Sequence, residues 1–450
     1  MKDSNYMENM GIKKLALKTS TPMVISMIAI ALYGITDSAF ISNISEDALT
    51  TVALSIPMQA IITAIGLGTG IGINSILAKF LGEKDNEKAQ KTIGYGFVFM
   101  LISWLVVAII SLFGTRSLFS FFTDNIKIQQ LGYEYFSILG IFSIGSMFQI
   151  LFQKILEAHG KTKMSMFVQF SGTGINLILD PLLIFGLLGM PALGIRGAAI
   201  STVIGQSIGA IIGLVCIIKN KIFNFKYLED VKFDKDIIKS IYEVGFPTML
   251  LEAADSFITL YLNKILIDFS EAAVSTWGVY GQLQKFVMII VYGLNYGMIP
   301  IVAYNLGAKK KERIKECISF YIKLALGVVV TGQLLFLIIP TQLISIFDVS
   351  DEVLSIAVPA FRILSCGFVF AGVSLVLSAT FQAFGNGTYS LIVNLSRKII
   401  FVLPILFMLK GVIGIYSVWT AFTIAEIATM IVAIVLYRKI SKKVMEEQYV

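Results

Sequence analysis

Two acidic residues, Asp37 and Asp180, stand inside long apolar stretches of the sequence. An ionisable side chain within a bilayer costs about 2.5–3.5 kcal/mol on insertion scales, so it is normally retained for a function. Because a helix rises about 1.5 Å per residue, both carboxylates are expected at similar depth in the outer half of the membrane. The sequence therefore predicts two buried acids that share one site.

Polar residues that could surround these acids occur at matching positions. Asn176 lies one helical turn before Asp180 on the same face. Tyr33 lies one turn before Asp37, and Thr202 is expected at the same level of a neighbouring helix. No cationic side chain is expected at that depth in the first half of the chain, and the lone histidine, His159, is expected in a solvated cytoplasmic loop.

Burial and mutual repulsion disfavour two charged carboxylates that have no cationic partner. The pair must then take up protons, bind a metal cation such as Na⁺, or face water. We interpret Asp37, Asp180, Asn176, Thr202 and Tyr33 as a cation-coupling site. The alternative is a structural pair of acids that is only hydrogen-bonded to these neighbours.

An internal repeat relates the two halves of the chain without a gap. It superimposes Pro22 on Pro247, Ser45 on Ser270, Gln59 on Gln284, Gly68 and Gly72 on Gly293 and Gly297, and Gly160 on Gly385. Such a repeat predicts two tandem membrane bundles with a site between them. We expect an N-terminal six-helix bundle at 1–218, a cytoplasmic linker at 219–240 and a C-terminal six-helix bundle at 241–450.

The second half of the chain does not repeat the acidic arrangement. The positions equivalent to Asp37, Asn176 and Asp180 are apolar and are occupied by Leu262, Phe401 and Ile405. Charges of both signs occur there instead, which favours internal ion pairs. The acids are Glu252, Asp255 and Glu426, and the bases are Lys285, Arg362, Arg397 and Lys398. Asp255 and Glu426 are a candidate second cation site.

Composition indicates an integral membrane protein. Hydrophobic residues make up 56% of the chain, charged residues only 14%, and the mean hydropathy is +0.82, whereas soluble domains average about 25% charged residues. The predicted fold class is an all-α membrane protein with twelve transmembrane helices in two pseudo-symmetric bundles. The predicted spans are 18–41, 52–78, 93–114, 131–153, 164–188, 197–218, 241–267, 274–303, 317–340, 353–380, 389–409 and 413–437.

Lys and Arg are distributed unevenly between the two predicted sides of the membrane. One side, with both termini, carries 26 of them and the other carries 4. Positively charged loops normally stay in the cytoplasm, so both termini are predicted there, in a multi-pass protein of the cell membrane. The net charge of +7 follows from this bias and predicts no nucleic-acid partner. The three cysteines have no metal or disulfide spacing, and no cofactor is expected.

A cavity for an apolar ligand is expected at the centre of the two bundles, since 33 Phe, 17 Tyr and 17 Met make it adaptable. Polar side chains within spans are candidates to line it: Gln59, Gln149, Gln206, Gln284 and Tyr292. The run from Gly66 to Gly72 has no preceding strand, so close helix packing is a better interpretation than a phosphate loop.

Over essentially all of its length the chain resembles the multidrug and toxic compound extrusion (MATE) family. The motifs that carry this resemblance are Tyr33-Gly-Ile-Thr-Asp-Ser-Ala-Phe40, Asn176-Leu-Ile-Leu-Asp-Pro-Leu-Leu-Ile-Phe185, Leu81-Gly-Glu-Lys and Leu306-Gly-Ala-Lys. They are most similar to the DinF-type branch, near bacterial exporters of the MepA kind. The resemblance implies a V-shaped pair of bundles that exports cationic, amphipathic drugs in exchange for H⁺ or Na⁺. It assigns ion coupling to Asp37, Asn176, Asp180 and Thr202.

The resemblance identifies fewer site residues in the second half of the chain. Another branch has an acid in the seventh span, which Asp255 matches, but the acid of its tenth span is missing and Arg362 stands nearby. We predict a secondary active antiporter that works by alternating access, as a monomer in the bilayer with small-molecule substrates. A flippase for a lipid-linked precursor is the alternative, although its cavity should be lined by several cations. An ion channel is a third hypothesis, whereas an enzyme is not expected because no His cluster or Ser-His pairing occurs.

Overall fold

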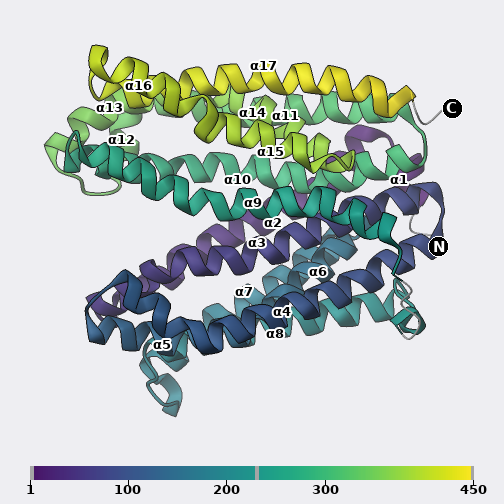
Figure 1. Cartoon of the computed structure of the whole chain (residues 1–450), viewed down its shortest axis with the longest axis horizontal. Helices are drawn as coiled ribbons and strands as arrows, with labels where there is room; N and C mark the ends of the chain where they lie inside the picture. The colour runs from purple at the N-terminus through teal and green to yellow at the C-terminus, as the bar shows by residue number, and fades with distance from the viewer. Residues whose placement is uncertain (1–4, 229–232, 447–450) are drawn as a thin grey trace. The chain divides into compact units, whose positions relative to one another are not determined.

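The computed structural model describes residues 5–228 and 233–446, without the side chains of residues 5, 6, 254–257, 259, 260, 445 and 446. Figure 1 shows long helices joined by short connections, and no strand occurs in the described residues. The apolar composition explains this, because a helix satisfies its own backbone hydrogen bonds and a short loop leaves little polar backbone in lipid.

The first half of the chain contains eight α-helices and two short 3-10 turns among its described residues. They are α1 (Asn5–Asn9), α2 (Ile12–Ser42), α3 (Glu46–Glu83), α4 (Asn86–Phe122), α5 (Ile126–Ile141), α6 (Ile144–Ala158), α7 (Thr162–Phe185), η1 (Leu187–Gly189), α8 (Ile195–Lys219) and η2 (Phe225–Leu228).

The second half contains nine α-helices and one π-helical turn among its described residues. They are α9 (Lys235–Ile267), α10 (Glu271–Gly307), α11 (Lys311–Ile338), α12 (Pro340–Ser345), α13 (Asp351–Ser365), α14 (Phe368–Ala383), α15 (Gly387–Leu395), η3 (Ser396–Ile400), α16 (Val402–Ile413) and α17 (Tyr416–Glu446).

Nine helical stretches in the described part of the chain are long and apolar enough to cross a membrane, and two bent helix pairs bring the number to 11. The remaining predicted span, 241–267, lies within α9. All twelve predicted helices are therefore present, and the expected fold class is confirmed.

The internal repeat is visible in the helix boundaries. Four pairs of helices begin at positions that the repeat superimposes: α3 and α10, α4 and α11, α5 and α13, and α7 and α15. Ser45 and Ser270 start the first pair in the same way, with extended backbone and a side chain that accepts a hydrogen bond at 3.1 Å from the backbone N–H of Ala48 or Ala273. Such a cap satisfies a donor that the helix leaves unpaired.

The predicted spans 131–153 and 353–380 are each broken in the structure. A bend of 42° separates α5 from α6, and a bend of 50° separates α13 from α14. At the first break Phe142 still donates its N–H to the Ile138 carbonyl at 3.1 Å, and at the second Gly367 donates to Leu364 at 3.0 Å. The backbone thus turns while its polar groups stay paired, and hydropathy alone does not reveal the break.

Contacts group the chain into two compact units. One unit is Ile25–Ala253, and the other combines Met1–Val24 with Ala254–Val450. Both boundaries fall inside continuous helices, α2 and α9. The division into bundles at 1–218 and 241–450 stays a prediction about the sequence halves, and residues 229–232 of the predicted linker 219–240 lie outside the described residues.

In the unit that contains residues 254–450, the beginning of α2 packs against α10 and α11. A Cβ at Gly297 would lie only 2.8 Å from the Cα of Ser20, so the absence of a side chain permits this approach. The Ser20 hydroxyl lies 2.7 Å from the Tyr321 hydroxyl, and Arg313 donates to the carbonyls of Met7 and Met10 at 2.9 and 2.8 Å. These bonds hold residues 7–20 within this unit.

The glycine run of α3 has the packing role that the sequence predicts. A Cβ at Gly68 would lie 2.7 Å from the carbonyl oxygen of Gly245 and 3.0 Å from the backbone nitrogen of Met249. Residues 66–72 also stand inside a continuous helix rather than in a loop. A phosphate-binding loop is thereby excluded, and the close approach attaches the beginning of α9 to the unit Ile25–Ala253.

Candidate functional site

A small apolar cluster in the unit Ile25–Ala253 fixes the helices that carry the two acids. It joins one end of α2, α3, α5, α7 and α8 through buried residues. Its members are Ile41, Ala48, Tyr135, Leu139, Ile184, Ile195, Ala198 and Ala199. Asp37 lies one turn before Ile41, Asp180 one turn before Ile184, and Ser201 follows Ala198 by three residues. The cluster therefore brings the polar residues of three helices to one level.

Asp180 is fully buried in α7 and is held by neutral donors. The hydroxyl of Ser201 in α8 donates to Oδ1 of Asp180. Asn176, one turn earlier in α7, donates from Nδ2 to Oδ2 at 3.1 Å in the amide orientation that satisfies its neighbours. Both oxygens of this carboxylate are thus hydrogen-bonded without an ion pair.

Asn176 connects Asp180 to α2. In the same orientation its Nδ2 also donates to the hydroxyl of Tyr33 at 3.1 Å, and its Oδ1 accepts from the backbone N–H of Thr202 at 2.9 Å. The Thr202 hydroxyl lies 3.4 Å from that of Tyr33. The structure therefore brings Tyr33, Asn176, Asp180 and Thr202 into one hydrogen-bond network.

The close approach of α7 and α8 depends on Gly205. A Cβ at this position would lie 2.6 Å from the carbonyl oxygen of Gly172 and 2.9 Å from the Cβ of Asn176. The two helices can therefore share Asn176 between them. Small residues at a membrane helix interface commonly permit such contacts.

Asp37 completes the site from α2. It is half-buried, it lies close enough to Asp180 and Tyr33 to interact electrostatically with both, and its Oδ1 has no hydrogen-bond partner among the described residues. Within residues 5–228 and 233–446 neither acid is in an ion pair. A pair of carboxylates with neutral oxygen and amide neighbours can accept a proton or bind a small hard cation. A cluster of three or more His, Cys, Asp or Glu does not occur in the described part of the chain.

Two residues of this neighbourhood escaped the sequence analysis. Ser201 adjoins the predicted Thr202 and makes the direct contact with Asp180. Tyr135 of α5 is buried within electrostatic range of Asp37 and is hydrogen-bonded to Gln59. Gln59 in turn donates to Ser55 at 2.9 Å. Of the candidate cavity residues, Gln59 therefore lies beside the acids.

The other candidate cavity residues lie elsewhere. Gln149 is buried between helices, where its amide lies against Gly172 and Gly209 and donates to the Val168 carbonyl at 3.4 Å. Gln206 is half-buried in α8. In the second unit Tyr292 is exposed on α10, and Gln284 of the same helix lines a pocket.

The candidate second cation site has a different geometry. Glu426 of α17 accepts hydrogen bonds from Nε and Nη2 of Arg397 at 3.0 and 2.6 Å, so it belongs to a buried ion pair. A cation at Glu426 would lie beside this guanidinium, and the like charge disfavours it. The side chain of Asp255 lies outside the described residues. His159 is half-buried rather than solvated, with Nδ1 2.9 Å from the Ile155 carbonyl.

Comparison with known sequences gives matches along nearly the whole chain. The MatE family model matches residues 22–182 and 247–408. The multidrug export protein MepA of Staphylococcus haemolyticus is 27% identical over 436 residues, which cover 95% of this chain and 94% of that protein. The protein of the same name from Staphylococcus saprophyticus is 25% identical over 446 residues, or 97% of each chain.

Solved structures with the same fold are also found. An outward-facing multidrug resistance MATE family transporter of the MOP superfamily matches with a TM-score of 0.92, 22% identity and 99% coverage of both chains. A MATE transporter in the bent conformation matches with a TM-score of 0.93, 22% identity and full coverage of both chains. This likeness confirms the predicted fold class.

Proposed function

Because this chain belongs to the MatE family, we propose that it is a secondary active antiporter that exports amphipathic, often cationic small molecules in exchange for H⁺ or Na⁺. The observation that carries the proposal is the pair Asp37 and Asp180, surrounded by neutral hydrogen-bonding groups and without an ion pair among the described residues. The names of its relatives, which are multidrug export proteins, support the class of substrate.

The coupling ion acts on the two carboxylates. With no cation bound, Asp37 and Asp180 repel each other in a partly buried site, and this repulsion opposes close approach of α2 and α7. A proton or Na⁺ on Asp37 removes the repulsion and favours a different packing of α2, which also contains Pro22. This change of packing lowers the affinity of the transporter for the drug. The transporter then returns to the conformation that is open to the cytoplasm, which completes the cycle of alternating access.

The energy available to this step is sufficient for export. One elementary charge that crosses 100 mV releases about 2.3 kcal/mol, which corresponds to a concentration ratio of roughly fifty. We place both termini in the cytoplasm on the distribution of Lys and Arg. The protein acts as a monomer in the cell membrane and needs no resident cofactor.

Transport in reconstituted vesicles tests this proposal. The purified protein is reconstituted into proteoliposomes, and the vesicles are loaded with ethidium. Efflux of ethidium is followed under an imposed pH gradient and, separately, under an imposed Na⁺ gradient. Asp37→Asn is expected to abolish gradient-driven efflux, because an amide cannot exchange a proton or a charge-compensating cation. Asp124→Asn, the same change at an exposed loop position of the same unit, is the control and should retain efflux. Wild-type rates in Asp37→Asn would disprove the coupling role.

A further inference from the structure

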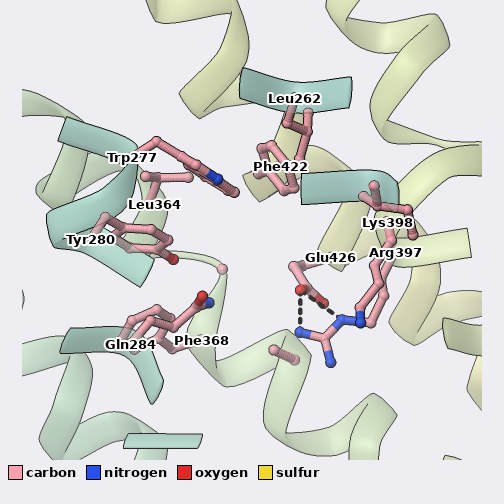
Figure 2. Close-up of a pocket in the computed structure, with 13 residues that line it drawn as sticks. Leu262, Trp277, Tyr280, Gln284, Leu364, Phe368, Arg397, Lys398, Phe422 and Glu426 are labelled. Atoms are coloured by element: carbon pink, nitrogen blue, oxygen red, sulfur yellow. Dashed lines mark hydrogen bonds and ion pairs between the residues drawn. The ribbon is translucent and has the colours of Figure 1, made fainter. Parts of the chain in front are cut away.

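The unit that contains residues 254–450 has a pocket of about 160 Å³ that the proposed function does not use. Aromatic side chains form much of its wall: Trp277 and Tyr280 of α10, Phe368 of α14 and Phe422 of α17. Figure 2 shows Tyr280 and Gln284 on one side of the space and Glu426 with Arg397 on the other. An apolar cavity of about 150 Å³ is large enough to hold benzene, so a single aromatic ring fits here.

Two local features build the polar side of this pocket. The π-helical turn η3 places the consecutive residues Arg397 and Lys398 on the wall of the pocket. π-Helical turns inside helices often occur at functional sites. Gly367 leaves room beside Glu426, since a Cβ there would already lie 3.4 Å from the Cγ of Glu426. The pocket thus reaches a buried carboxylate.

The carboxylate of Glu426 can accept a further hydrogen bond. The residue is only 8% exposed, and both bonds from Arg397 go to Oε1. Oε2 is buried and has no hydrogen-bond partner among the described residues. A buried acceptor without a donor is costly, so a rotation of the carboxylate that turns Oε2 toward a ligand N–H or O–H in the pocket is favourable. On the opposite side, the Gln284 amide and the Tyr280 hydroxyl point into the same space (Figure 2).

The charges around the pocket select against ionic ligands. An organic cation would meet Arg397 and Lys398, and an anion would meet the carboxylate of Glu426, so a ligand of either charge lies near at least one like charge. We propose that this pocket binds an uncharged aromatic ring that carries a hydrogen-bond donor, such as an aryl amide, with the ring against the aromatic side chains and the donor on Glu426. This site lies within one unit and does not depend on the coupling role of Asp37.

Binding of three probes of the same shape tests the proposal. They are 4-fluorobenzamide, 4-fluorobenzamidine and 4-fluorobenzoate, which are neutral, cationic and anionic. Their binding to the full-length protein in lipid nanodiscs is measured by fluorine NMR, without any ion gradient. The neutral amide is expected to bind at least tenfold more tightly than either ion. Equal or tighter binding of a charged probe, or no binding of the amide at millimolar concentration, would overturn the proposal.

Substitutions of pocket residues test whether 4-fluorobenzamide binds in this pocket. Gln284→Leu is expected to weaken binding of 4-fluorobenzamide at least fivefold, while Gln333→Leu, the same change on α11 away from the pocket, leaves it unchanged. Glu426→Gln removes the charge that repels an anion, so binding of 4-fluorobenzoate should rise. If this variant does not fold, the two glutamine variants still decide the matter. Equal affinity of Gln284→Leu and the wild type would show that the amide binds elsewhere.

Discussion

Four glycines of α10 allow the free-energy cost of close helix packing to be measured, because two of them contact α2 and two have no neighbour at the Cβ position. Gly293 faces the backbone of α2, where a Cβ would lie 2.6 Å from the Cα and 2.9 Å from the nitrogen of Val24. Gly278 has nothing within 4 Å of the same position. Ordinary contacts of a Cβ begin at 3.4 Å, and because the obstacle is backbone, no side-chain rotation can relieve the clash. Gly293→Ala must therefore move one helix away from the other.

The expected magnitude follows from the difference between two variants. Gly278→Ala should stabilise the protein by about 1 kcal/mol, because alanine favours a helix more than glycine does. Gly293→Ala gains the same helix propensity but is also destabilised by overpacking, which typically costs about 1–3 kcal/mol. Subtracting one variant from the other removes the propensity and leaves the packing cost of the contact between α10 and α2.

The assay is thermal unfolding of the detergent-purified full chain, followed by tryptophan fluorescence at one constant heating rate because unfolding of such proteins is often irreversible. The midpoint of Gly293→Ala should lie below the wild-type midpoint or near it, and that of Gly278→Ala should lie above it. Gly297→Ala and Gly281→Ala provide a second packed and open pair in the same helix. The reasoning is refuted if the packed and open variants have the same midpoint.

Three further results are expected. Ser201→Ala removes a hydrogen bond to the Asp180 carboxylate, a contact worth about 1.5–3 kcal/mol, so ethidium efflux from proteoliposomes should fall roughly tenfold or more; an unchanged rate would contradict the network. Glu426→Gln breaks the buried ion pair with Arg397 and should lower the unfolding midpoint, because breaking a buried pair costs about 3–5 kcal/mol; an unchanged midpoint would contradict a stabilising role of this pair. Burial lowers the pKa of His159 from 6.5 to about 4, so below pH 6.5 the unfolded chain binds a proton that the folded chain does not, and stability falls with pH until about 4. His159→Gln should flatten this part of the stability profile, and a wild-type slope in that variant would assign the dependence to another group.

The helices and their repeat could be predicted from the sequence because both rest on local signals. Long apolar runs set the spans, and Ser45 and Ser270 mark equivalent helix starts through the same capping bond. The bends near residues 142 and 366 could not be predicted, since the chain stays apolar through each and the turn keeps its backbone hydrogen bonds. The π-helical turn at Ser396–Ile400 is equally invisible to a period of 3.6 residues.

The depth of the candidate site in the membrane could be predicted from the sequence, but the face that each helix turns toward its neighbours could not. Rise per residue brought Asp37, Asp180 and Thr202 to one level, but it does not say which side of α8 faces α7. Consequently Ser201, the residue in direct contact with Asp180, was missed although it is adjacent to Thr202. In the second half, internal pairing was expected, yet only the fold could select Arg397 as the partner of Glu426, 29 residues away.

The division of α2 between the two compact units has a consequence for biosynthesis. Residues 7–20 leave the ribosome long before their hydrogen-bonding partners Arg313 and Tyr321 are translated. The packing surface of residues 7–20 therefore stays uncovered in the nascent chain until α11 has been synthesised. Truncated translation products that end before α11 would lack the means to finish this unit and should be recognised by quality-control proteases.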